Sequence, residues 1–394
     1  MLDAPTIGAH QGVTQELLEL ARAEAGRDDA ENRFFETTHR ALVAAGHYVS
    51  TVPAPLGGGG LDLPAAAWQQ RQLARYAPAA ALASSMHLYW TGSAADLSAA
   101  GLPGLEFIAD VALDGGIIAS GHAEAGNDVP IVLSTSTAEP VDGGYRVTGR
   151  KHFGSLGPVW DLMGFHALDA SVPDRPVVIH GFVRREDDGV TVVEDWDTMA
   201  MRASQSFDTV LDGVFVPSDR VVAAVPAGSP ESPVTGAMSV WALTLISNVY
   251  VGVAERALEL AVGAAGQRTS IALGGRAMSA NPMVQHRVAE MWIALDGARS
   301  GLDAVADDWA AGIDHGPMWG PKVFAAKERT AQAVRFVLDT AADVVGGSSL
   351  RSDSELSRLW RDSRAVSFHP ADHAFAHEAI GKAVLGVDSA GPRW

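Results

Sequence analysis

The chain has 394 residues, of which 47% are hydrophobic and 19% charged, a composition typical of a globular protein with a large buried core. Lysine and arginine number 29 against 47 aspartates and glutamates, so the formal net charge is −18 at pH 7. Such an acidic chain repels phosphate backbones and anionic lipids, which argues against nucleic acid or a membrane surface as partner. Cysteine is absent, which excludes disulfides, iron–sulfur clusters and thiolate chemistry.

Residues 1–115 are predicted to form an N-terminal helical domain. The first residues have neither a basic nor an apolar segment typical of a signal peptide, so we expect a cytoplasmic protein. Thr14 is suited to cap a helix in QELLELARAEA, and apolar residues then recur at helical spacing. The glycine run 57–60 follows helix and loop instead of a strand and lacks GK[ST], so it predicts a connecting loop and not a phosphate site.

Residues 116–225 are predicted to form a central β domain. Short β-branched runs such as GYRVTGRKHFGS and RPVVIHGFVRR alternate with glycine, proline and aspartate, as in an antiparallel barrel or sandwich. The glycine pair 143–144 after Val-Asp is typical of a hairpin tip.

Residues 226–394 are predicted to form a C-terminal helical bundle, which makes the whole chain an α+β protein. The 23 residues from Ser232 to Ala254 carry no formal charge and could suggest a membrane span. They include serine, threonine, asparagine and glycine, whose polar groups would lie unpaired in lipid, so a buried core helix is the better interpretation.

Several strings resemble the acyl-CoA dehydrogenase fold family, and they occur in the family's order. GHAEAGND at 121–128 is similar to its TEPxAGSD loop along the flavin, and GYRVTGRKHFGS at 144–155 to a strand pair that ends beside the flavin. The strings at 197–217, 344–350 and 359–369 resemble its GMRxSxS, GGxG and RDxR/K segments. The resemblance covers nearly the whole chain and implies that family's architecture.

The C-terminal segment departs from the dehydrogenases. A subgroup of them keeps a proton-abstracting glutamate shortly after RDxR/K, where this chain has SFHP with His369 and Pro370. In other branches of the family this glutamate comes from another helix. The string instead resembles the monooxygenase branch, in which reduced flavin and O2 form a C4a-(hydro)peroxyflavin. By that resemblance His369 is catalytic and can accept or donate a proton near neutral pH. On the residues alone, a solvated or hydrogen-bonded structural histidine is the better interpretation.

The resemblance implies two further catalytic residues. Ser155 takes the position of the family's hydroxyl beside flavin N5, although serine is also common in turns, and Phe153 lies on the same strand face. His87 lies on the helix that places a second histidine opposite the first, with Trp90 at i+3 as a substrate-pocket residue. Both residues of that helix also fit a packed core.

The flavin-binding residues implied by the resemblance are Ser120, Gly121, His122, Phe153, Ser155 and Arg202. Ser120, Gly121 and His122 would approach the flavin through their backbone, whereas Arg202 could be a structural anchor.

A metal site is not expected. His369, His373 and His377 are spaced four residues apart, but Pro370 gives His369 a helix-start geometry and no carboxylate has diagnostic spacing.

The resemblance also implies cofactors and partners. Asp343 stands where the dehydrogenases have a glutamine for the adenine end of FAD, so FMN and FAD both stay open. A nicotinamide-binding Rossmann unit is not apparent, so a separate NAD(P)H-dependent flavin reductase would supply the reduced flavin. We expect a homotetramer that hydroxylates a small aromatic or polycyclic (phenol- or indole-like) molecule. N-hydroxylation of an amine or amino sugar and acyl-CoA dehydrogenation are the alternatives.

Overall fold

The computed structural model describes residues 13–229 and 232–387. The N-terminal part is helical, and Thr14 caps its first helix because its Oγ1 accepts a hydrogen bond from Leu17 N at 3.2 Å. The helices are α1 (Gln15–Ala30), α2 (Glu36–Ala44), α3 (Leu63–Tyr76), α4 (Pro78–Ala99) and α5 (Glu106–Leu113).

The glycine run before α3 is a connecting loop. A Cβ at Gly58 would come within 2.2 Å of Val52 O, and one at Gly59 within 2.6 Å of Ser50 O. These glycines therefore serve close packing against the preceding turn.

Eight strands follow and form one sheet with the order β6-β7-β3-β2-β4-β5-β8, while β1 pairs with β4. The strands are β1 (Ile118–Gly121), β2 (Thr137–Val141), β3 (Gly144–Gly154), β4 (Leu162–Asp169), β5 (Val177–Arg184), β6 (Val190–Val193), β7 (Phe207–Pro217) and β8 (Val221–Pro226). The expected hairpin joins β2 to β3, with Val141 opposite Gly144 and Gly143 at φ +80°.

The predicted order of a helical domain, a β domain and a helical bundle is confirmed, but the sheet is not the antiparallel barrel or sandwich expected for these strands. The sheet is mixed, because β1 and β2 both run parallel to β4, and it is not closed. One edge of β4 is shared, with Leu162 opposite Ile118 of β1 and Leu168 opposite Thr137 of β2. Strand β1 thus pairs with the first half of β4, from Leu162 to Phe165, whereas β2 pairs with β4 further along, at Leu168. The candidate site residues lie near β1.

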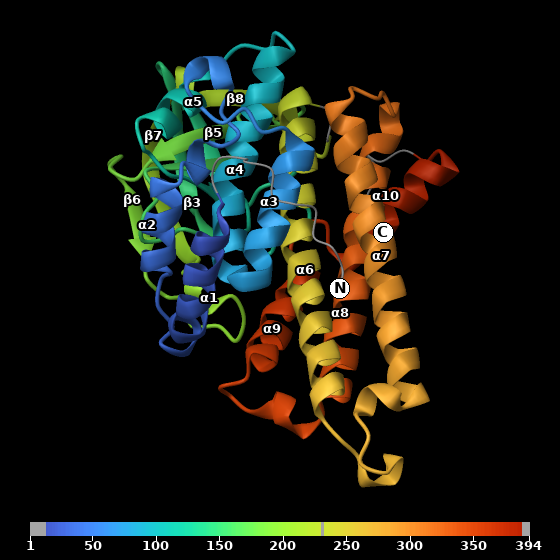
Figure 1. The fold of residues 1–394 in the computed structure, drawn as a ribbon. Helices are drawn as coiled ribbons and strands as arrows, with labels where there is room; N and C mark the ends of the chain where they lie inside the picture. Colours follow the sequence, from blue (N-terminus) through green and yellow to red (C-terminus); the bar gives the residue numbers. More distant parts are fainter. Residues whose placement is uncertain (1–12, 230–231, 388–394) are drawn as a thin grey trace.

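The C-terminal helices are α6 (Pro233–Gln267), α7 (Pro282–Ala310), α8 (Trp319–Val345), α9 (Glu355–Ser363) and α10 (His373–Leu385). Helix α6 packs against α3 and α4 on one side and against α7 and α8 on the other, so it joins the two halves of the molecule (Figure 1). It is long and apolar enough to cross a membrane, yet 89% of its most apolar window is buried inside the protein. The prediction of a buried core helix is confirmed.

Candidate functional site

Strand β1 is wedged between β3 and β4. A Cβ at Gly121 would lie 2.9 Å from Met163 Sδ of β4 and 3.2 Å from Lys151 Cβ of β3, so a larger residue there would force these side chains to shift. One residue earlier, Ser120 Oγ accepts hydrogen bonds from Trp90 Nε1, at 3.0 Å, and from the Tyr89 hydroxyl. The structure thus brings the predicted residues Ser120, Gly121 and Trp90 together.

His122 begins a column of three stacked imidazoles, in which His122 is half-buried and His166 and His180 are buried. Its ring stacks on His166 with centroids 5.5 Å apart, and His166 stacks on His180 at 6.0 Å. Burial lowers the pKa of His122 to about 3 and that of His180 to about 4, so both rings are neutral at pH 7. Among the described residues, His122 Nε2 is buried without a hydrogen-bond partner. That nitrogen can therefore bond to a group that the protein chain does not supply.

A buried ion pair supports this column. Lys151 Nζ lies 2.5 Å from Glu124 Oε1 and 2.5 Å from His166 O, and both charged side chains are completely buried. Burial alone would raise the pKa of Glu124, but the Lys151 cation and the hydrogen bonds that Glu124 accepts hold it well below its usual range. Burial lowers the pKa of Lys151 to about 8 despite its partner.

The sequence analysis missed this pair. Its one signal was a lysine at an inward-facing position of a β-branched strand, where a charge needs a buried partner.

The end of β3 carries the predicted flavin-facing residues. The register of β3 against β7 shifts between Lys151 and Gly154, and within this irregularity Phe153 has φ +60° and is 62% exposed. The Phe153 ring faces Trp196 edge-on, with centroids 6.0 Å apart. Such left-handed backbone costs a residue with a side chain about 1–2 kcal/mol and is frequent at functional sites.

Three serine hydroxyls form a chain behind this strand end. Ser155 Oγ lies 2.8 Å from Ser206 Oγ, which lies 2.7 Å from Ser204 Oγ, and all three side chains are buried. The backbone bends sharply on both sides of the chain, with Leu156 at φ +66° and Gln205 at φ +42°. The end of β3 is connected to the segment after β1, because the main-chain N–H of the residue before Phe153 donates to Ala123 O at 2.9 Å.

Arg202 is held by the protein itself. Its Nε donates to Asp29 O at 2.9 Å and its Nη1 to Thr198 O at 2.8 Å. The preceding residue, Met201, has φ +52°, and its N–H donates to Asp362 Oδ1 of α9 at 2.6 Å. The guanidinium therefore anchors the loop that leads to the serine chain, and its predicted role toward flavin remains a prediction.

His369 lies between α9 and α10 and pairs with α6. Its Nε2 is 2.6 Å from the Tyr250 hydroxyl, and the two ring centroids are 5.4 Å apart. Burial and then the charge of Lys327 lower the pKa of His369 to about 4, while burial raises the pKa of Tyr250 well above its usual value. Both groups are neutral at pH 7, so the hydrogen bond is donated by the tyrosine hydroxyl or by the imidazole Nε2–H, according to the tautomer of His369.

His87 has a different environment. Its Nε2 lies 2.6 Å from Tyr48 O, and its Nδ1 accepts from Ile118 N at 3.0 Å. The ring is fully buried, and burial lowers its pKa to about 4. Both nitrogens are thus occupied by main-chain groups, one in the turn at Tyr48 and one at the start of β1. The catalytic role of His87 stays a prediction. Its hydrogen bonds favour a structural role instead, in which the imidazole anchors β1.

The predicted residues form two groups. Ser120, Gly121, His122 and Trp90 adjoin the strand end that carries Phe153 and Ser155. His369 belongs to the helical side, and within residues 13–229 and 232–387 no hydrogen bond or ring contact joins it directly to the first group. Asp362 links the His369–Tyr250 pair indirectly to the loop at Met201. Its carboxylate adds to the effect of burial in raising the pKa of Tyr250, and it also accepts a hydrogen bond from Met201 N.

Comparisons with known proteins agree on one family. A model described as "Acyl-CoA dehydrogenase, C-terminal domain" matches residues 243–369. The putative acyl-CoA dehydrogenase YdbM of Bacillus subtilis (strain 168) is 29% identical over 91% of this chain and 92% of its own length. L-evernosamine nitrososynthase of a Micromonospora species is 29% identical over 93% and 87%. Dibenzothiophene monooxygenase of Rhodococcus qingshengii is 26% identical over 95% and 92%.

A solved structure has the same fold over nearly the whole chain. It is KijD3 in complex with FMN and dTDP-3-amino-2,3,6-trideoxy-4-keto-3-methyl-D-glucose. It superposes with a TM-score of 0.79 at 25% identity and covers 95% of this chain and 92% of its own.

Proposed function

Since this chain belongs to the acyl-CoA dehydrogenase fold superfamily, we propose that it is a flavin-dependent monooxygenase that uses reduced flavin and O2 to oxygenate a small organic molecule. Dibenzothiophene monooxygenase matches over 95% of this chain and 92% of its own length, which supports this reaction class. The substrate proposed first is an aromatic or polycyclic molecule, by analogy with dibenzothiophene monooxygenase.

The residues around β1 and the end of β3 fit a flavin. Phe153 offers an exposed aromatic ring, Ser155 offers a buried hydroxyl, and His122 Nε2 is a buried polar atom without a protein partner. We assign Ser120, His122, Phe153 and Ser155 to flavin binding on this ground. When bound and reduced, the flavin would activate O2, and the chain would orient the substrate, exclude water and handle protons.

The observation that carries the proposal is the pair of His369 and Tyr250. On α6, which supplies the tyrosine, residues 233–254 contain no carboxylate, and the first one, Glu255, lies beside Arg75, whose Nε is 3.9 Å from Glu255 Oε2. The described carboxylates near His369 in sequence are otherwise engaged: Asp362 accepts from Met201 N, and Asp372 caps α10 at Phe375 N. A neutral imidazole bonded to a neutral tyrosine can accept a proton at one ring nitrogen while it releases one at the other.

One relative supports a second substrate class. L-evernosamine nitrososynthase is more similar to this chain than dibenzothiophene monooxygenase is, at 29% against 26% identity. N-oxygenation of an amine or amino sugar would use the same flavin chemistry with nitrogen as the acceptor.

Substrate-dependent O2 consumption tests these classes. The protein is supplied with FMN or FAD, a generic NAD(P)H-dependent flavin reductase and either a phenol or indole, or a primary amine or amino sugar. We expect oxygenated product with one of the two sets. Anaerobic bleaching of bound oxidised flavin by an acyl-CoA, without any oxygenated product, would instead identify a dehydrogenase.

His369→Ala tests the assignment of the proton carrier. We expect unchanged flavin affinity, less product per O2 consumed and more hydrogen peroxide, because the proton transfer that couples oxygen to substrate is lost. His286→Ala is the matched control, since His286 is an exposed histidine on α7. Equal coupling in His369→Ala and the wild type would remove His369 from the mechanism.

The proposal extends to partners and assembly. A separate NAD(P)H-dependent reductase would supply reduced FMN or FAD, and the chain would act in the cytoplasm as a homotetramer. Asp343, which replaces the glutamine that holds the adenine end of FAD in the dehydrogenases, is exposed and 3.7 Å from Arg287. The loss of that glutamine weakens the expected hold on FAD, so FMN and a loosely held FAD both stay open as the cofactor.

A further inference from the structure

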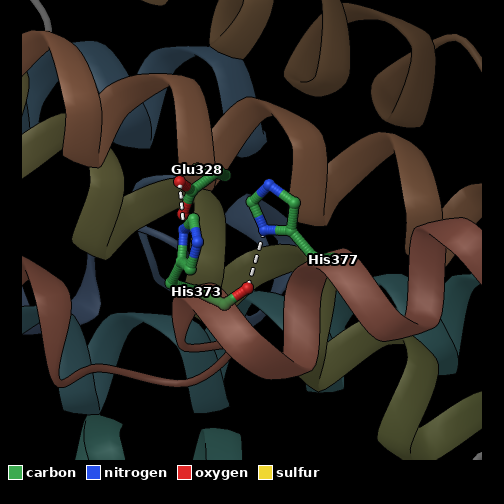
Figure 2. Close-up of side chains that lie close together, drawn as sticks. All are labelled: Glu328, His373 and His377. Atoms are coloured by element: carbon green, nitrogen blue, oxygen red, sulfur yellow. Dashed lines mark hydrogen bonds and ion pairs between the residues drawn. The ribbon is translucent and has the colours of Figure 1, made fainter.

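Two histidines of α10 and a glutamate of α8 converge on the side of the bundle. Figure 2 shows His373 and His377 projecting from α10 toward Glu328. One ligand atom from each of the three residues lies within 4.8 Å of the other two. His373 and His377 are four residues apart in one helix, so their rings share a face, and the ring centroids are 4.1 Å apart.

The present contacts of these side chains hold the group together without a cation. His373 Nδ1 lies 2.8 Å from Glu328 Oε1, and His377 Nδ1 lies 2.7 Å from the main-chain oxygen of His373. Gln332 Nε2 also donates to Glu328 Oε1 at 2.7 Å, so the carboxylate is oriented from its own helix. In metal sites such outer hydrogen bonds orient the ligands.

We infer that Glu328, His373 and His377 form a binding site for a divalent transition-metal ion of the zinc type. Two imidazoles and a carboxylate are the ligand set of many zinc sites and suit Zn²⁺, Ni²⁺ or Cu²⁺ better than Mg²⁺ or Ca²⁺. The ligand atoms must approach to about 2.0–2.2 Å from the ion. His373, whose side chain is 68% exposed, can turn to achieve this without disturbing the core.

The position of the site gives the ion a structural consequence. It would cross-link α10 to α8 immediately after the segment that carries His369, since α10 begins at His373. This inference does not depend on the proposed oxygenase activity, because metal binding is measured in the absence of flavin and substrate.

The test is titration of the chelator-treated, tag-free full-length protein with Zn²⁺ by isothermal titration calorimetry. We expect one ion per chain, and a rise of at least about 2 °C in melting temperature when Zn²⁺ is in excess. His377→Ala and Glu328→Gln should each weaken Zn²⁺ binding by about 100-fold or more, because loss of a ligand costs more than loss of an outer partner. The control His286→Ala should bind as the wild type does.

The visible absorption of bound Co²⁺ reports on the ligands of the ion and not on the folding of the protein. In the wild type, bound Co²⁺ should show the visible absorption of a site with fewer than six ligands, and His377→Ala should lose it. If wild type and His377→Ala bind Zn²⁺ with equal affinity, or the wild type binds none below millimolar concentration, the three residues form only a histidine–carboxylate ion pair and the inference is wrong.

Discussion

Replacing His87 by glutamine distinguishes a structural anchor from a catalytic group. In the folded protein His87 Nδ1 accepts a hydrogen bond from Ile118 N, so protonation would set two donors against each other inside the core. This agrees with a pKa that burial lowers to about 4 from the ordinary value of about 6.5. Because the unfolded chain binds the proton more tightly, the stability of the protein falls as the pH drops from about 6.5 toward 4.

The size of this effect follows from the two pKa values. At pH 5 the unfolded histidine is mostly protonated and the folded one is mostly neutral, which costs about 2 kcal/mol relative to pH 7. His87→Gln removes this proton from both states. We therefore expect the free energy of unfolding of His87→Gln to be about 1–3 kcal/mol lower than that of the wild type at pH 7, because glutamine makes imperfect hydrogen bonds to Tyr48 O and Ile118 N. Between pH 7 and pH 5, however, the free energy of unfolding should fall by about 2 kcal/mol less in His87→Gln than in the wild type.

Urea unfolding at the two pH values measures this difference. His286→Gln, at an exposed position, should keep the pH dependence of the wild type. If His87→Gln also keeps it, the imidazole titrates normally in the folded protein and the anchor interpretation is refuted.

Two further substitutions test the flavin face and the core beneath it. Phe153→Ala should leave the melting temperature nearly unchanged, because the residue is 62% exposed, but should weaken flavin binding by roughly 3–10-fold. Equal flavin affinity of variant and wild type in a fluorescence titration would exclude stacking of the flavin on this ring. Lys151→Met should lower the free energy of unfolding by about 3–5 kcal/mol in urea, since it leaves the buried Glu124 carboxylate without its cation. A decrease below about 1 kcal/mol would show that the pair is not charged in the folded protein.

Local patterns were sufficient for much of the fold. The uncharged run beginning at Ser232 predicted the buried helix α6, and the glycine pair at 143–144 predicted the β2–β3 hairpin, because both depend on neighbouring residues only. The parallel pairing of β1 with β4 places Ile118 opposite Leu162, and the sequence of neither strand indicates which strand it pairs with. The mixed, open sheet therefore could not be predicted from periodicity.

The site shows the same division. The family resemblance predicted Ser120 and the i+3 spacing from His87 predicted Trp90, and the fold brings these two residues together. The buried partner of Lys151, in contrast, lies 27 residues away on another segment. The carboxylate beside His373 is likewise 45 residues upstream on α8, so histidine spacing alone could not reveal it. His87 resembled a pocket histidine in sequence, whereas its bonds are to the main chain of distant elements.

The central claim, that this chain uses reduced flavin to activate O2, is tested most directly by rapid mixing. The protein is loaded anaerobically with reduced FMN or FAD and mixed with oxygenated buffer while the flavin spectrum is recorded. We predict a transient species whose absorbance matches neither reduced nor oxidised flavin, and whose decay yields oxygenated product when substrate is present. Direct conversion of reduced to oxidised flavin, with no transient for either flavin and no product, would contradict the claim.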